Sequence, residues 1–193
     1  FGSFGLFVAL GVTSISGEHL LSFGTLENTR REKAEMLRRL SPAETVILNA
    51  DDPSVMWMAG RTKAGIITCG FSPSADIRAT DYRMIPQGGI AFQVRVEGRI
   101  YPVCLPLLGR HMVFPVLAAI AVAWREGRDP AGTCRKLETM EALRGRMQAV
   151  RLASGALLIR DDFKSNRESL QAALQVLRDY PATRKILVLG GVA

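Results

Sequence analysis

The sequence predicts an α/β protein with a mostly parallel central sheet, flanking helices and a small antiparallel insert. Three short apolar segments, 6–13, 45–49 and 65–69, are typical of buried parallel strands. A helical pattern over 25–40 separates the first two, and a short helix opening at Pro53 separates the second from the third. Strands that alternate with helices in this way indicate βαβ units in a parallel sheet.

An antiparallel signature follows these units. Residues 90–96 read IAFQVRV and alternate apolar with polar side chains, as expected for a strand with one buried face. Glycine-containing turns flank this segment, so we expect an antiparallel insert over about 76–107. Two helical patterns come next, at 111–126 and 130–143.

A second α/β unit begins after Gly145. Segments 147–152 and 156–160 are predicted strands, Ser165 or Asn166 can cap a helix, and 185–189 is a predicted parallel strand. One βαβ unit cannot bury both of its faces, so the predicted domains are 1–145, nearly complete, and 146–193, the opening of a second domain. Because the sequence begins at Phe1 and stops after an apolar run, we expect a piece of a longer protein.

The charge balance narrows the classes of partner. The 193 residues carry 25 Lys and Arg against 18 Asp and Glu, a net charge of +7 that favours anionic partners without choosing among them. Aromatic residues make up only 7% and form no stripe with basic ones, which argues against nucleic acid as the partner. The three cysteines form no C-x-x-C pair, and no apolar run reaches membrane-spanning length, so the sequence predicts a cytoplasmic protein with no membrane span. The oligomeric state is left open.

Three places could carry chemistry, although neither a P-loop nor a G-x-G-x-x-G motif occurs in the sequence. His19, with Glu18, follows a predicted strand and could bind a metal, or could be a loop histidine bonded to backbone. Lys33 lies on a helix among carboxylates, where an exposed charge ladder is the alternative. The segment 161–166, DDFKSN, precedes a helix and could hold a nucleotide or simply cap that helix.

Taken together, these places resemble one family, the Mur ligases, which are ATP-dependent amide-forming enzymes of bacterial cell-wall synthesis. Their order and spacing match over nearly the whole chain. The matching segments are 13–20 (TSISGEHL), 23–27, 31–35, 48–53 (LNADDP), 109–121, 145–147 (GRM) and 161–166 (DDFKSN). Within the family, the last segment most resembles that of the ligase adding D-alanyl-D-alanine, whereas Phe163 and Lys164 resemble the lysine loop of the D-glutamate-adding enzyme.

The resemblance implies a Rossmann-like fold for the second domain and an acyl-phosphate mechanism. ATP phosphorylates a carboxylate, an amine attacks the acyl phosphate, and an amide forms. The substrate would be an anionic UDP-N-acetylmuramoyl-peptide or a related carboxylate, and the cofactors would be ATP and Mg²⁺. Such chemistry needs cations rather than a protein nucleophile, because charge develops on phosphoryl oxygens.

The resemblance also implies roles for single residues. His19 would bind Mg²⁺, Lys33 would be carbamylated and support that metal, and Lys164 would approach the phosphates or the acyl intermediate. The implied ATP-binding residues are Asn49, His111, Arg146, which also could link the domains, and Asp162, which would hold the ribose.

The chain departs from the family pattern at Ser14, Met112 and Pro115, each of which replaces an asparagine. Ser14 removes an amide but keeps a hydrogen-bonding group, whereas neither Met112 nor Pro115 reproduces an amide's paired donor and acceptor. Two alternatives therefore stay open: a non-catalytic or diverged relative that binds a nucleotide or partner, and an amide ligase for a different substrate. Because the sequence lacks a phosphate loop, we expect that this chain alone does not turn over ATP.

Overall fold

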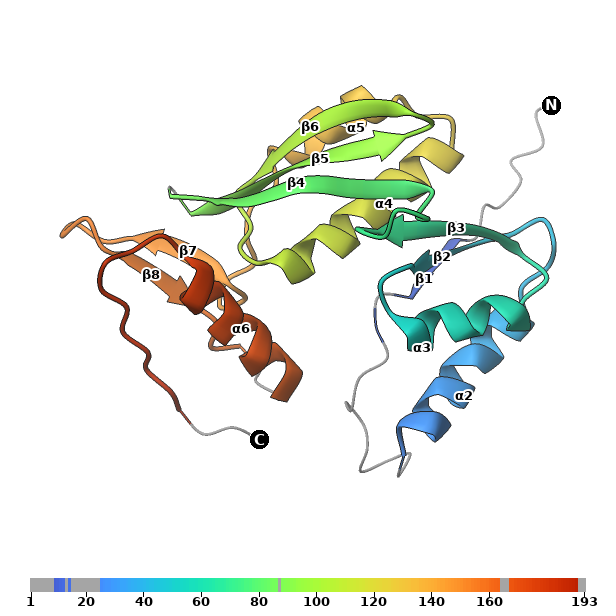
Figure 1. Cartoon of the computed structure of the whole chain (residues 1–193), viewed down its shortest axis with the longest axis horizontal. Coiled ribbons are helices and arrows are strands. Elements are labelled where there is room, and N and C mark those ends of the chain that lie inside the picture. The colour runs from blue at the N-terminus through green and yellow to red at the C-terminus, as the bar shows by residue number, and fades with distance from the viewer. Residues whose placement is uncertain (1–8, 13, 15–24, 87, 164–166, 191–193) are drawn as a thin grey trace.

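A six-stranded sheet is the centre of the computed structural model, which describes residues 9–12, 14, 25–86, 88–163 and 167–190 (Figure 1). The strands are ordered β1-β2-β3-β4-β5-β6; β1 to β4 pair in parallel, and β4, β5 and β6 pair antiparallel. This agrees with the predicted fold class. The strands are β1 (Ala9–Val12), β2 (Thr45–Asn49), β3 (Gly65–Gly70), β4 (Ile77–Ile85), β5 (Gly89–Val96) and β6 (Arg99–Leu105).

The antiparallel strands extend the parallel sheet directly. Ile77 of β4 pairs with Cys69 at the end of β3, and Arg78 pairs with Gly70. This short parallel ladder places β4 beside β3, after which the chain turns back twice to form β5 and β6. The predicted insert is therefore one half of the same sheet.

Helices cover both faces of the sheet because side chains alternate along β2. Val46 and Leu48 face one core, where they meet Leu37, while Ile47 faces the other core with Leu117. The first core is covered by α2 (Leu26–Arg38), α3 (Pro53–Met56) and the 3₁₀ helix η1 (Trp57–Arg61). The second core is covered by α4 (Val113–Arg125) and α5 (Pro130–Leu137), and the short 3₁₀ helix η2 (Arg110–Met112) precedes α4.

A second unit packs against one end of this sheet (Figure 1). Leu108, which is fully buried, contacts a small core with Met147, Val176 and Tyr180, and the Tyr180 hydroxyl donates to the Pro86 carbonyl at 2.5 Å. The unit consists of an antiparallel pair, β7 (Gln148–Arg151) and β8 (Leu157–Arg160), and of α6 (Arg167–Asp179).

Two predicted elements differ from the structure. The strand expected at 185–189 is absent from the described residues, because no described strand lies beside it to pair with its backbone, and Val188 is 89% exposed. The helix expected over 130–143 ends at Leu137, where the Thr139 hydroxyl donates to the Lys136 carbonyl and turns the chain. Within the ranges described, no helix has the length and apolar character needed to cross a membrane.

Candidate functional site

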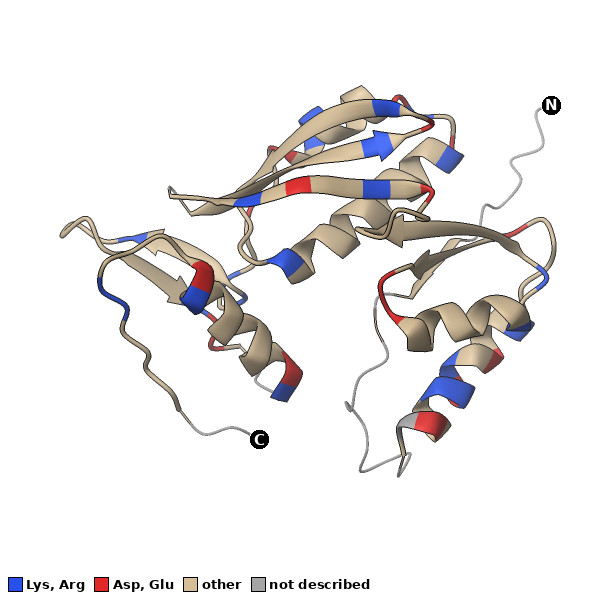
Figure 2. Cartoon of the chain, in the orientation of Figure 1, with Lys and Arg blue, Asp and Glu red and all other residues tan. Residues whose placement is uncertain are grey.

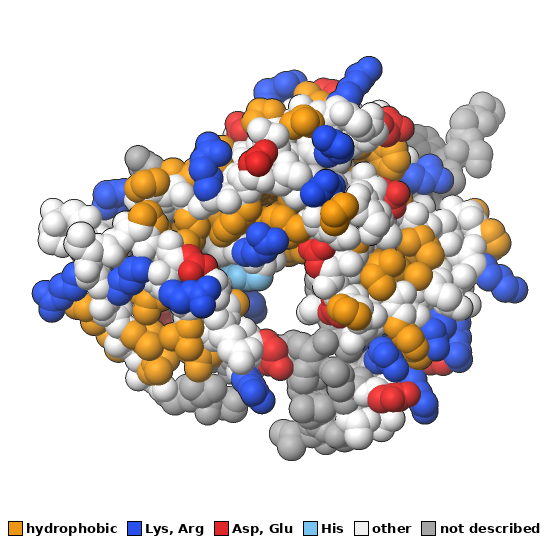
Figure 3. Space-filling view, in the orientation of Figure 1, with side chains coloured by type: hydrophobic (Ala, Val, Ile, Leu, Met, Phe, Trp, Pro, Cys, Tyr) orange, Lys and Arg blue, Asp and Glu red, His pale blue; other side chains and the backbone are white. Residues whose placement is uncertain are grey.

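A pocket of about 480 Å³ lies where the carboxyl ends of the parallel strands meet the start of α4. Ligand sites of open α/β sheets collect at this edge, because the loops that follow the strands converge there. Figure 3 shows a hollow in the middle of this face, between the β7–β8–α6 unit and the α2–α3 layer. The pocket is lined by Ser14, Asn49, Asp51, Gly70, Phe71, Arg110, His111, Phe114, Pro115 and Leu117.

The turn after β2 places Asn49 at this edge. The Asp51 backbone N–H donates to Asn49 Oδ1 at 2.9 Å, which folds the chain sharply after the strand. Asp52 then caps α3, since its Oδ1 accepts from the Ser54 N–H at 2.8 Å, and Pro53 occupies the first turn. The segment 48–53 therefore ends a strand and starts a helix within a few residues.

Asp51 joins the loops after β2 and β3. Its carboxylate accepts from the Phe71 N–H at 2.7 Å and from the Ser72 N–H at 2.8 Å. Gly70 permits this approach, because a Cβ there would lie 2.8 Å from the Asp51 carboxylate atoms. The contact fixes Phe71 in the pocket wall. Sequence reasoning missed this role of Asp51, for which the only local signal is a glycine directly after an apolar strand.

Arg110 contributes a positive charge that the sequence analysis did not single out. Its guanidinium carbon lies 3.4 Å from the centroid of the Phe71 ring and 5.8 Å from that of Tyr82. The two rings meet edge to face with centroids 6.3 Å apart. Stacking on aromatic faces holds the guanidinium in place at the pocket wall. The sequence did offer one sign that Arg110 belongs to the site, because it lies between Gly109 and His111 of the 109–121 segment.

The position of His111 depends on Gly109. Gly109 has φ +98° and ψ 145°, a conformation almost reserved for glycine, and a Cβ there would lie 2.4 Å from His111 Cε1. Desolvation by the surrounding protein lowers the pKa of His111, and the negative charge of Asp161 opposes part of this shift. This lowered pKa favours the neutral imidazole, in which one nitrogen donates and the other accepts.

The structure brings Arg146 and Asp162 together in the second unit. Their loops are joined by the Phe163 N–H, which donates to the Gly145 carbonyl at 3.0 Å, and the guanidinium of Arg146 lies 4.6 Å from the Phe163 ring. Arg160 donates to Asp162 at 2.8 Å, and this hydrogen bond lowers the pKa of the Asp162 carboxyl. Neither Arg146 nor Asp162 lines the pocket that contains Asn49 and His111.

Lys33 reaches the same edge of the sheet from α2. Its Nζ donates to the Ser14 carbonyl, beyond the end of β1, at 3.1 Å. Among the described residues, the ion pairs of α2 join Glu27 to Arg30 and Arg31 and Glu35 to Arg38, so this charge ladder forms without Lys33. Within the described ranges no three His, Cys, Asp or Glu side chains cluster as a metal site. His19 and Lys164 lie outside the described residues.

The positions that depart from the family pattern differ in their surroundings. Ser14 and Pro115 line the pocket, and Pro115 offers it no hydrogen-bonding group. Met112 is packed against the core beneath α4. The pocket therefore combines an amide, a neutral imidazole and a guanidinium with an apolar wall that includes Phe114.

Comparisons with known proteins agree on one family. Residues 7–123 match the model of the Mur ligase middle domain. The UDP-N-acetylmuramate–L-alanine ligase of Xanthomonas campestris is 33% identical over 185 residues, which cover 92% of this chain and 38% of that protein. The chain thus spans about 38% of the length of the curated relatives it matches.

Solved structures are similar over most of the chain. A structure of MurF from Acinetobacter baumannii has a TM-score of 0.79 and 28% identity, covering 89% of this chain and 37% of that one. A UDP-N-acetylmuramoylalanyl-D-glutamyl-2,6-diaminopimelate–D-alanyl-D-alanyl ligase from the same organism has a TM-score of 0.75 and 27% identity, with the same coverage. These structures support the predicted nearness of the chain to the D-alanyl-D-alanine-adding member, whereas the curated relative named above is an L-alanine ligase.

Proposed function

The chain belongs to the Mur ligase family, and we propose that it forms part of an ATP-dependent amide ligase for cell-wall precursors. In this proposal residues 1–145 belong to the central domain and 146–193 open the carboxyl-terminal domain. The substrate is a UDP-N-acetylmuramoyl-peptide or a related carboxylate, and the protein acts in the cytoplasm. The observation that carries the proposal is the pocket at the strand ends, which joins Asn49 and His111 beside Lys33 and Ser14.

The residues of this pocket fit a nucleotide. Its volume of about 480 Å³ is that of a small-molecule site. The neutral His111 and the Asn49 side chain offer hydrogen bonds, Phe71 and Phe114 give aromatic surface, and Arg110 supplies a cation for an anionic group. In the second unit, Asp162 would accept hydrogen bonds from the ribose hydroxyls, and Arg146 would contact the nucleotide or link the domains.

The reaction joins two substrates in two steps. A substrate carboxylate oxygen forms a bond to the γ-phosphorus of ATP as ADP leaves. The amine nitrogen then forms a bond to the acyl carbon and gives up a proton as phosphate leaves. Both steps place negative charge on phosphoryl oxygens, which Arg110 and Lys164 would stabilise. When bound, Mg²⁺ would neutralise further charge on the phosphates, with His19 and a carbamylated Lys33 as the proposed supporting residues.

Carbamylation would change what Lys33 offers. The neutral amine of Lys33 adds to the carbon of CO₂ and releases a proton, which leaves an anionic carbamate in place of a cation. In the structure the unmodified ammonium donates to the carbonyl of Ser14, two residues beyond the end of β1 at this edge of the sheet. This location at the strand ends, which a charge ladder along α2 does not explain, supports a role for Lys33 at the site.

The test is Lys33→Ala in the intact ligase that contains this chain. We expect loss of ligation and partial rescue by a small carboxylic acid, which would restore the missing anion. Lys63→Ala, at an exposed lysine, is the matched control and should keep full activity. Full activity of Lys33→Ala, or loss without rescue, would contradict the carbamate role. We also expect no Mg²⁺-dependent ATP hydrolysis from the 193-residue chain, and turnover by it would contradict the proposed division of the active site.

A non-catalytic relative that binds a nucleotide or a partner is the second candidate, and the place of Ser14 and Pro115 in the pocket, where the family has asparagines, favours it. Calorimetric titration of the intact protein with ATP separates the two functions. Binding together with ligation supports the ligase, and binding without ligation supports the non-catalytic relative. A protein with no affinity for ATP at millimolar concentration excludes a nucleotide role for the pocket.

A further inference from the structure

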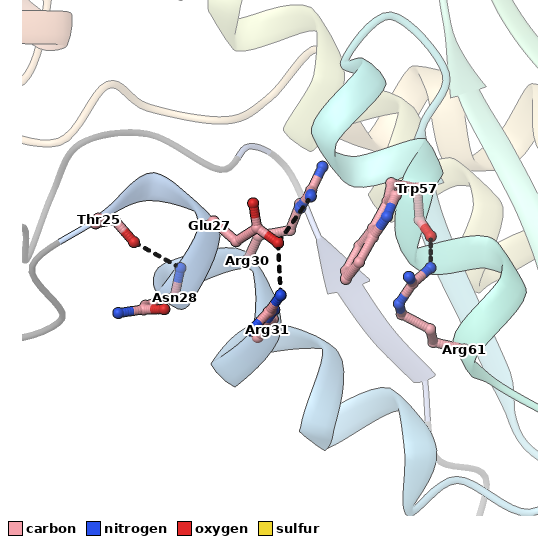
Figure 4. A network of polar contacts seen from close by, with 7 residues as sticks. All are labelled: Thr25, Glu27, Asn28, Arg30, Arg31, Trp57 and Arg61. Atoms are coloured by element: carbon pink, nitrogen blue, oxygen red, sulfur yellow. Dashed lines mark hydrogen bonds and ion pairs between the residues drawn. The ribbon is translucent and has the colours of Figure 1, made fainter.

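Two arginines enclose the indole of Trp57, a residue outside the pocket lining described above. The guanidinium carbon of Arg30, from α2, lies 3.9 Å from the ring centroid, and that of Arg61, from η1, lies 3.0 Å from it. Figure 4 shows the indole between the two side chains. None of the three residues lines the candidate nucleotide pocket.

Both guanidinium groups are fixed before any ligand arrives. Arg61 Nη1 donates to the Trp57 carbonyl at 2.7 Å. The guanidinium of Arg61 is therefore held by this hydrogen bond as well as by stacking on the indole ring. The Arg30 side chain is only 24% exposed, and its Nε is buried without a hydrogen-bond partner among the described residues. Its nearest carboxylate, that of Glu27, lies 3.8 Å from Arg30 Nη2 and 2.8 Å from Arg31 Nη2. Within the part of the chain that the structure describes, the Arg30 guanidinium therefore makes only one distant ion pair, through Nη2, while its Nε is shielded from solvent and would not contact a ligand.

The surroundings carry more positive than negative charge. Glu27 and Glu35 pair at close range with Arg31 and Arg38, and no carboxylate of the described chain forms an ion pair with Arg61. Desolvation, together with the positive charges of Arg30, Arg38 and Arg31, lowers the pKa of Arg61. Figure 2 shows basic residues along α2 and at the far end of the α3–η1 segment. An anion at this surface would relieve the repulsion among these arginines.

We propose that Arg30 and Arg61, on the two faces of Trp57, form a binding site for a diphosphate group. A guanidinium presents several N–H donors in one plane and binds phosphate oxygens in pairs. Because the indole separates the two groups, a single phosphate would engage one of them, whereas two linked phosphates along the ring edge would engage both. This inference goes beyond the proposed ligase activity and does not depend on it.

The test uses the fluorescence of Trp57 as a reporter. The chain has two tryptophans, and Trp124 packs against the core beneath α4, so Trp124→Phe leaves Trp57 as the single emitter. This variant is titrated with inorganic pyrophosphate, inorganic phosphate and UDP at constant ionic strength. We expect a saturable change with pyrophosphate and an affinity about tenfold weaker for phosphate. If UDP binds more tightly than pyrophosphate, the site recognises a nucleoside diphosphate. If the two bind equally, the site recognises the diphosphate group alone.

Substitutions localise the site. In the Trp124→Phe background, Arg61→Gln and Arg30→Gln should each weaken pyrophosphate binding about tenfold, because each removes one of the two guanidinium groups. Arg95→Gln is the matched control, since Arg95 is exposed on β5, and it should leave binding unchanged. Circular dichroism establishes which variants fold, and Arg61→Lys, which keeps the charge, replaces Arg61→Gln if the latter does not. No saturable change up to about 20 mM pyrophosphate, or an equal loss in Arg95→Gln, would overturn the proposal.

Discussion

Replacing Gly109 by alanine tests how the backbone before α4 positions His111. The substitution keeps a conformation that alanine rarely adopts, φ +98° and ψ 145°, at a cost of about 1–3 kcal/mol. The new methyl group would also lie 2.4 Å and 2.6 Å from two His111 ring atoms and 2.9 Å from Val176 Cγ2. Displacing that imidazole from its rotamer adds about 1 kcal/mol. We therefore expect the free energy of unfolding to fall by about 2–4 kcal/mol.

Urea denaturation measures this loss. With a slope of about 2 kcal/mol per molar urea, the midpoint should fall by about 1–2 M. Gly98→Ala is the matched control, because Gly98 also has a positive φ, +78°, but nothing lies within 4 Å of a Cβ there. Its midpoint should fall by only about 0.5 M, from backbone strain alone.

A second measurement follows the imidazole itself. The NMR titration of His111, assigned with a His111→Gln variant, should show its pKa moving back toward 6.5 in Gly109→Ala, because the displaced ring becomes better hydrated. Equal midpoints for the two glycine variants, with an unchanged His111 titration, would refute the steric argument.

Two further predictions concern titratable groups. Folding lowers the pKa of His111, so as the pH drops below about 6.5 the imidazole is protonated in the unfolded chain before it is protonated in the folded one. The free energy of unfolding should therefore fall over this range. Urea midpoints between pH 5.5 and 7.5 should show this loss in the parent chain and a smaller one in His111→Gln; parallel profiles would contradict it. Burial raises the pKa of Cys69 to about 12 and that of Cys134 to about 11, while Cys104 is exposed. Ellman's reagent at pH 8 should therefore label one thiol rapidly in the native chain, and Cys104→Ser should remove this phase; rapid labelling of all three would contradict the burial.

Local patterns were sufficient for most elements. The apolar run at 45–49 forms β2 with the predicted bounds, Pro53 starts α3, and the alternation at 90–96 lies within β5. These features depend on side-chain periodicity and on the backbone limits of proline, which are properties of neighbouring residues. Helix and strand ends were less accurate where capping decided them, as at Leu137.

The candidate site was predicted only in part. The positions of Asn49 and His111 follow from motifs, and the structure joins them in one pocket. The contact of Asp51 with Phe71, and the stacking of Arg110 on that ring, join loops about twenty and forty residues apart. No periodicity in the sequence reports such contacts, because they arise only when neighbouring strands end at the same edge.

The sequence by itself determined an α/β chain of the Mur ligase family, with the segments that form its parallel strands and the residues that its motifs mark. Only the tertiary structure decided that β4 continues the parallel sheet, that 185–189 remains unpaired, and that Trp57 lies between Arg30 and Arg61. Secondary structure follows from local periodicity and capping, whereas strand pairing and side-chain stacking depend on which distant segments meet once the cores are buried.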